Sequence, residues 1–137
     1  MMDTGELTTL LEPGAVVTDP DLMQAAVRDW TGRWIGSSPA IVYPSSTADV
    51  VAVVRWCRDH VVAIVPQGGN TGMVGGGVPL NGEVLLNLTR MSAITVDEAS
   101  GQLTADAGAR LVDVQRAAAD AGWRYCVDLG ARDSATI

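Results

Sequence analysis

The 137-residue sequence predicts an α+β fold that contains a βαβ unit. Three observations support this prediction. A helix with a capping signal lies between two short apolar runs, two strand-like segments flank a turn, and a second amphipathic helix follows them. With 47% hydrophobic and 18% charged residues, the chain can build a folded core, and its length fits one domain.

The predicted βαβ unit begins at Pro39–Pro44, a short apolar segment closed by proline. Ser46–Asp49 is a capping-box signature, and the apolar residues after it are spaced as on one helix face: Val50, Val53, Val54 and Cys57. Val61–Val65 is a continuous apolar run, rich in β-branched residues and stopped by Pro66. This pattern is typical of a strand buried on both faces of a parallel sheet.

Further along the chain, Glu83–Leu88 has the composition of another strand. Ile94–Asp97 and Gln102–Ala107 flank Glu98–Gly101, which is a suitable hairpin connection. A second amphipathic helix is expected at 111–121, with Gly122 at its C′ position.

Residues 1–38 are expected to form a helical preamble, and residues 39–137 the main domain. Within the preamble, Leu22–Trp30 predicts a short helix with Asp19 or Asp21 as its cap. The start of the chain, Met1–Glu6, is acidic and lacks the features of a secretory signal, so we expect a cytoplasmic protein.

Charge and composition exclude several classes of partner. A net charge of −7 argues against nucleic acid as a general partner. Two cysteines and one histidine are too few for a zinc site, and we expect no metal site. The long uncharged run Val61–Gly82 contains Pro66, Pro79 and many glycines, which excludes a membrane-spanning helix there.

The most informative stretch is the glycine-rich loop at Pro66–Gly77, which holds six of the 15 glycines. Glycine lets successive backbone N–H groups converge on an anion, and Asn70 and Thr71 add side-chain donors. Because no Lys or Arg lies between Arg58 and Arg90, amides and hydroxyls must bind any anion here. This favours the diphosphate of a dinucleotide, and the alternative is a packed or flexible loop without a ligand.

Together with Asp29–Trp34 and Asp128–Ile137, this loop resembles the FAD-linked oxidases that have a p-cresol methylhydroxylase type FAD-binding domain. Within that family the chain is most similar to the D-2-hydroxyacid dehydrogenases, such as D-2-hydroxyglutarate and D-lactate dehydrogenases and the flavin subunit of glycolate oxidase. The resemblance implies the first subdomain of such a domain and the start of the second, incomplete at the C-terminus. The family's second motif continues with a Gly-Gly pair beyond Ile137, and the cap domain with its catalytic and metal-binding residues is missing.

The resemblance also implies which residues contact FAD. The loop and the C-terminal segment would supply Pro66, Gln67, Gly68, Gly69, Asn70, Thr71, Gly72, Met73, Gly75, Gly76, Leu129, Gly130, Ser134, Ala135, Thr136 and Ile137. Thr71 stands where covalently flavinylated relatives carry His, which implies non-covalent FAD. No catalytic residue is assigned within the chain, and we expect the chain alone to bind FAD weakly or not at all.

By this resemblance, the full enzyme would oxidise a D-2-hydroxy acid to a 2-oxo acid, with hydride transfer to flavin N5. Two alternatives stay open: another oxidoreductase on the same fold, such as a sugar-nucleotide reductase or alditol oxidase, and a flavin-free interaction or regulatory domain. We also expect a homodimer or larger oligomer, formed through bare surfaces at Glu83–Leu88, Gln102–Ala107 and the tail Asp128–Ile137.

The other chemistry-bearing side chains are interpreted as structural. These are Trp30 and Trp34 as packing residues, Cys57 as a core thiol, Cys126 as an unactivated thiol, His60 at a helix end, and Arg33 and Arg132 as solvated or ion-paired.

Overall fold

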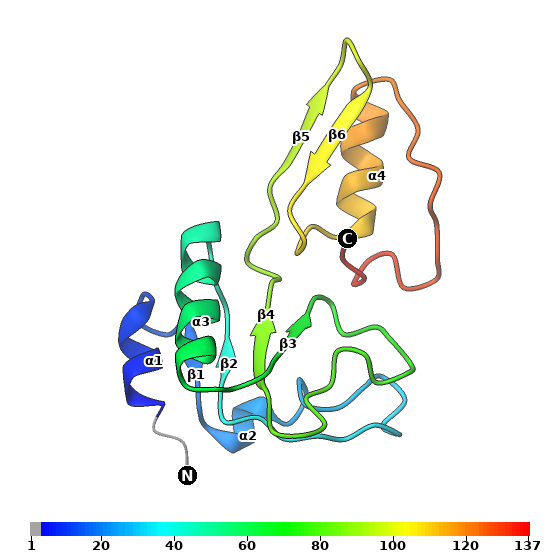
Figure 1. Ribbon diagram of the computed structural model, residues 1–137. Coiled ribbons are helices and arrows are strands. Elements are labelled where there is room, and N and C mark those ends of the chain that lie inside the picture. The colour runs from blue at the N-terminus through cyan, green and yellow to red at the C-terminus, as the bar shows by residue number, and fades with distance from the viewer. Residues whose placement is uncertain (1–3) are drawn as a thin grey trace.

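The computed structural model describes residues 4–137; residues 1–3, the start of the acidic N-terminal segment, lie outside this range. The helices are α1 (Gly5–Leu10), α2 (Pro20–Met23), α3 (Thr47–Asp59) and α4 (Leu111–Asp120). The strands are β1 (Val16–Val17), β2 (Ile41–Val42), β3 (Ile64–Gln67), β4 (Val84–Asn87), β5 (Ile94–Asp97) and β6 (Gln102–Ala105). The first four strands form one sheet, and β5 and β6 form a hairpin beside α4 (Figure 1).

The main sheet has the strand order β1-β2-β4-β3. Strand β4 runs parallel to both β2 and β3, whereas β1 pairs antiparallel with β2. The connection β2–α3–β3 is the predicted βαβ unit, and β4 lies between its two strands. Because β4 is central, all of its residues are buried.

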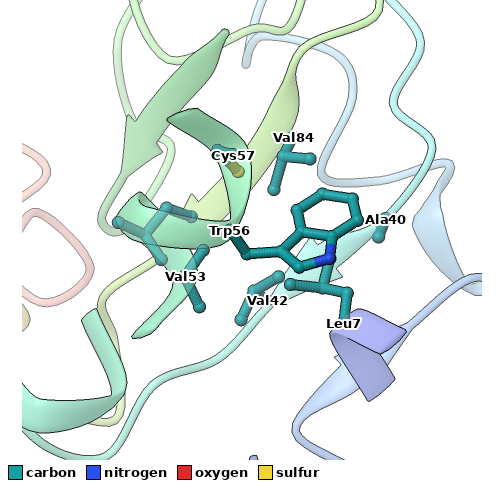
Figure 2. Packing of buried hydrophobic residues seen from close by; sticks show 8 residues of the cluster. Leu7, Ala40, Val42, Val53, Trp56, Cys57 and Val84 are labelled. Atoms are coloured by element: carbon teal, nitrogen blue, oxygen red, sulfur yellow. The ribbon is translucent and has the colours of Figure 1, made fainter. Parts of the chain in front are cut away.

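Successive side chains of the central strands point to opposite faces of the sheet, so each face carries its own hydrophobic cluster. Figure 2 shows the larger cluster, in which Trp56 of α3 lies among Leu7 of α1, Val42 of β2 and Val84 of β4. On the opposite face, Ile41 and Leu85 pack with Met23 of α2. The sheet is therefore covered on both sides, as a parallel sheet requires.

The capping box of α3 is confirmed. The Ser46 hydroxyl accepts a hydrogen bond from the Asp49 N–H at 3.2 Å, and the Asp49 carboxylate accepts from the Ser46 N–H at 3.1 Å. At the other end, Val61 has a φ of 56°, and the Val62 N–H reaches back to the Cys57 carbonyl at 2.8 Å. Helix α4 ends in the same way with Gly122 at a φ of 78°, as predicted for its C′ position.

Two predicted elements are corrected. The helix expected at Leu22–Trp30 is wrong, because α2 ends at Met23 and the chain continues in turns. The strand expected at Val61–Val65 begins only at Ile64 and continues through Pro66. Proline is accepted there because β3 is an edge strand, and for the same reason β3 is only partly buried.

The hairpin of β5 and β6 is confirmed as an antiparallel pair, and α4 packs against β5. The prediction that Glu83–Leu88 is a bare surface is wrong, because β4 has a partner on each side. β6, by contrast, pairs only with β5 among the described residues. No helix within residues 4–137 has the length and apolar character needed to cross a membrane.

The division between a preamble (1–38) and a main domain (39–137) stays a prediction. Residues before the boundary nevertheless take part in the same core, since β1 extends the sheet and Leu7 is fully buried against α3.

Candidate functional site

The glycine-rich loop leaves the carboxyl end of β3 and returns along the molecule to the start of β4. Within the described chain, none of the backbone N–H groups from Gly68 to Gly77 donates a hydrogen bond to a protein atom. Because most residues of this run are exposed or half-buried, their N–H groups are open to water or to a ligand. The loop is therefore a surface of available donors beside the carboxyl end of the sheet, where open α/β sheets bind ligands.

Two side chains in this region already donate hydrogen bonds to backbone carbonyls of the protein. The Gln67 amide donates to the carbonyls of Ala26 and Gly77, both at 2.8 Å. The Asn70 amide donates to the Arg28 carbonyl at 2.8 Å, and Asn70 has a left-handed φ of 51°. The expectation that the Asn70 side chain is a free donor is therefore wrong, since this amide ties the loop to the turn after α2.

The C-terminal segment approaches the loop so closely that only glycine fits. A Cβ added at Gly68 would overlap the Thr136 side chain, and one added at Gly69 would overlap the Ser134 carbonyl oxygen. The segment is held from the other side by α4, whose Leu111 N–H donates to the Ala135 carbonyl at 2.9 Å. The two predicted motifs, far apart in sequence, thus meet, and Figure 1 shows the C-terminus returning toward the end of β3.

Two adjoining hollows lie along this contact. The smaller, about 260 Å³, is lined mainly by the loop together with Asp29 and Thr136. The larger, about 930 Å³, lies between Trp30, the loop and the C-terminal segment. Of the described residues that line the two hollows, none is Lys or Arg.

Most of the predicted cofactor-contacting residues line these hollows. Pro66, Gln67, Gly68, Gly69, Asn70, Thr71, Gly72, Gly75, Gly76 and Thr136 line the smaller one, and Met73, Leu129, Gly130, Ser134 and Ala135 line the larger. The hydroxyls of Thr71, Ser134 and Thr136 have no hydrogen-bond partner within residues 4–137. Ile137 lines neither hollow, and its N–H donates to the Ala109 carbonyl at 3.0 Å.

Sequence reasoning missed several lining residues. These are Asp29, Trp30, Gly77, Val78 and Ala131. The Asp29–Trp34 motif was the signal that could have identified the first two. Trp30 is 75% exposed at the larger hollow, so the prediction that it is a packing residue is wrong. Trp34 does pack, because its ring lies where a Cβ of Gly75 would be.

Residues 38–137 match the family described as FAD binding domain. The chain belongs to this FAD-binding family.

Named relatives agree with this membership. The chain is 39% identical over 136 residues to a probable mitochondrial D-2-hydroxyglutarate dehydrogenase of Oryza sativa subsp. indica, covering 98% of this chain and 24% of the relative. It is 39% identical over 133 residues to a D-2-hydroxyglutarate dehydrogenase of Stutzerimonas stutzeri, covering 96% of this chain and 29% of the relative. The chain thus spans about a quarter of these relatives' length.

Solved structures share the fold. An alkyldihydroxyacetonephosphate synthase superposes with a TM-score of 0.83 at 19% identity, covering 97% of this chain and 27% of that one. 6-Hydroxy-D-nicotine oxidase from Arthrobacter nicotinovorans superposes with a TM-score of 0.72 at 26% identity, covering 82% and 25%. The predicted α+β fold of an FAD-linked oxidase is therefore confirmed.

The donor set of this FAD-binding chain fits a diphosphate. The N–H groups from Gly68 to Gly77 make no hydrogen bond within the described chain, and most of these residues, Thr71 among them, line the smaller hollow. Such a set of donors without Lys or Arg suits an anion whose charge is spread over two phosphates. Arg132 lines neither hollow, and its Nη1 pairs with both oxygens of Asp128, at 3.0 and 3.1 Å. That pairing lowers the pKa of Asp128 and confirms the interpretation of Arg132 as ion-paired.

Asp29 is the one acidic residue in the wall of the smaller hollow among the described residues. Burial raises its pKa, but hydrogen bonds from the Thr31 hydroxyl and the Trp34 N–H outweigh that effect, and the net pKa lies below the usual value. Asp29 therefore stays ionised at neutral pH, and donors of its own turn stabilise the negative charge. Among residues 4–137, no group of three acidic, His or Cys side chains is placed to hold a metal ion.

Proposed function

We propose that this chain is the FAD-binding part of a flavin-dependent dehydrogenase that oxidises a D-2-hydroxy acid to a 2-oxo acid. The observation that carries the proposal is the uninterrupted run of free N–H groups from Gly68 to Gly77, closed on one side by the C-terminal segment. The relatives named D-2-hydroxyglutarate dehydrogenase support the substrate class.

The chain's own residues bind and orient the cofactor. The loop amides and the Thr71 hydroxyl hold the diphosphate, while Ser134 and Thr136 offer hydroxyls from the facing segment. The absence of side chains at Gly68 and Gly69 lets this segment come close enough to form the second wall. FAD, when bound, supplies the chemistry, accepting at N5 a hydride from C2 of the hydroxy acid.

Non-covalent binding is part of the proposal, because Thr71 offers only a hydroxyl at the position where the loop would be linked to the flavin. A cytoplasmic location stays a prediction, and some relatives are named as mitochondrial proteins. A different oxidoreductase on this fold stays the alternative, since the solved structures with this fold include an alkyldihydroxyacetonephosphate synthase and a 6-hydroxy-D-nicotine oxidase.

A fluorescence titration with FAD tests the proposal. Of the two outcomes expected from the sequence, weak binding or none, the proposed site requires the first: saturable binding with a dissociation constant weaker than micromolar. Weak binding is expected because the chain supplies only part of the length over which its relatives are built. Removing the donor with Thr71→Val should weaken binding roughly two- to tenfold. The matched control Thr104→Val changes an exposed residue of β6 and should leave the affinity unchanged.

Equal effects of the two substitutions, or no FAD binding at all, would contradict the proposed site. A sub-micromolar dissociation constant would contradict the expectation of weak binding. In a dye-reduction assay with D-2-hydroxyglutarate, D-lactate or glycolate, we expect no turnover by this chain even with added FAD, because no catalytic residue is assigned within it.

A further inference from the structure

The Gln67 side chain is buried at the start of the glycine-rich loop, with 4% of its surface exposed. Both donors of its amide are used, for the carbonyls of Ala26 and Gly77, each at 2.8 Å. Its oxygen accepts a hydrogen bond from the Asn87 side-chain amide at 3.1 Å. This side chain therefore has no donor left for a ligand, although the residue lies in the wall of the smaller hollow.

The contact with Gly77 connects the two ends of the loop. Gln67 ends β3 and directly precedes the first glycine of the loop, and Gly77 is the last glycine. The backbone N–H groups between them make no hydrogen bonds within the described chain, so no internal ladder fixes the loop. A glycine-rich segment has high conformational entropy, and side-chain contacts must hold it in one arrangement.

The orientation of the Gln67 amide is set by its neighbours. The Asn87 oxygen accepts from the Thr89 N–H at 3.1 Å and from the Thr89 hydroxyl at 2.5 Å. The Asn87 nitrogen is consequently directed at the Gln67 oxygen, which leaves the Gln67 nitrogen to face the two carbonyls. Asn87 is itself 7% exposed and belongs to the central strand β4, so the base of this chain of hydrogen bonds is fixed in the sheet.

We propose that Gln67 is a positioning residue that closes the ends of the loop, so that its amides already converge before a diphosphate arrives. This inference rests on the proposed function for its ligand. The residue acts on affinity by reducing the ordering that binding would otherwise require, without touching the diphosphate through its side chain. Asn70 assists by attaching the middle of the loop to the Arg28 carbonyl.

The test compares Gln67→Met with the control Val114→Ala. Methionine keeps the side-chain length of Gln67 but removes all three of its side-chain hydrogen bonds. Val114 is fully buried in α4 and lines neither hollow, so the control destabilises the fold by a different route. Backbone ¹⁵N relaxation of the ligand-free chain and an ADP titration are measured on each variant.

For Gln67→Met we expect lower heteronuclear NOE values confined to residues 68–77, and an ADP dissociation constant roughly tenfold weaker than that of the unsubstituted chain. For Val114→Ala we expect a lower melting temperature with unchanged loop order and an ADP affinity within about twofold. Unchanged NOE values at residues 68–77 in Gln67→Met would overturn the inference, whatever the ADP dissociation constant of that variant.

Loss of loop order in Gln67→Met, with no ADP binding by the unsubstituted chain, would overturn the proposed function while supporting Gln67 as the residue that holds the loop. If Gln67→Met does not fold, Asn87→Asp replaces it. Removing the Asn87 donor should turn the Gln67 amide away from one carbonyl and loosen residues 68–77 to a smaller extent, and an ordered loop in that variant would overturn the inference.

Discussion

The substitution Gly69→Ala should push the C-terminal segment away from the glycine-rich loop, because the added methyl group has no room between them. An added Cβ would overlap the Ser134 carbonyl oxygen and lie 2.8 Å from its carbon, whereas Cβ atoms essentially never come within 3.0 Å of another heavy atom. Both partners are backbone, so the segment must retreat by more than about 1 Å. Overpacking of this kind costs about 1–3 kcal/mol. Gly69 does not have a positive φ, so alanine adds no backbone strain, and the effect is steric alone.

Thermal unfolding and ¹⁵N chemical shifts measure this change. A loss of 1–3 kcal/mol lowers the melting temperature of a domain of this size by about 3–12 °C. We also expect shifted amide signals at Ser134 and Thr136. The control Gly76→Ala adds the same methyl group where nothing lies within 4 Å and should leave the melting temperature unchanged. Gly69→Ala with the stability and shifts of the unsubstituted chain would refute the close contact.

Four further expectations concern stability, reactivity and assembly. Val61→Gly should stabilise the chain by about 0.5–1 kcal/mol in urea unfolding, because Val61 is 92% exposed with a φ of 56°; a destabilised variant would contradict this. Hydrogen bonds from Ser45 hold the pKa of Asp49 below 3.8. The ionised Asp49 carboxylate therefore stabilises the folded chain at neutral pH, and this contribution is lost as the pH falls through the lowered pKa. Asp49→Asn should therefore lose less stability on acidification than the unsubstituted chain, and equal losses would contradict the assignment. Burial raises the pKa of the Cys57 thiol to about 11. At pH 8 only the exposed Cys126 should therefore react rapidly with a thiol reagent, and rapid labelling of both cysteines would contradict the burial of Cys57. The open edge of β6 should support a homodimer, and light scattering that finds only monomer at high concentration would exclude it.

Elements with local signals could be predicted from the sequence. The capping box at Ser46 and Asp49 fixes the start of α3, and the turn between β5 and β6 fixes the hairpin. Each depends on hydrogen bonds between residues close in sequence, so the residue pattern alone contains the information. The prediction that the glycine-rich loop offers backbone donors to an anion rests on composition, because glycine determines the freedom of the backbone, and it stays a prediction.

Elements decided by distant contacts could not be predicted. The helix expected at Leu22–Trp30 ends early, and the carbonyls of Ala26 and Arg28 accept instead from the side chains of Gln67 and Asn70. For the same reason those two amides could not be recognised as structural from sequence. The position of β4 between β2 and β3 is likewise a property of the whole sheet, and it decides which strand edges are covered.

The most direct test of the account is an amide-shift titration of the ¹⁵N-labelled chain with FAD, ADP and riboflavin in parallel. If the free N–H groups from Gly68 to Gly77 bind a diphosphate, FAD and ADP should both shift the signals of these residues and of Thr136. Riboflavin, which has no diphosphate, should leave the loop signals in place. Loop shifts of equal size with riboflavin, or shifts with FAD that avoid residues 68–77, would contradict the assignment of this loop as the diphosphate site.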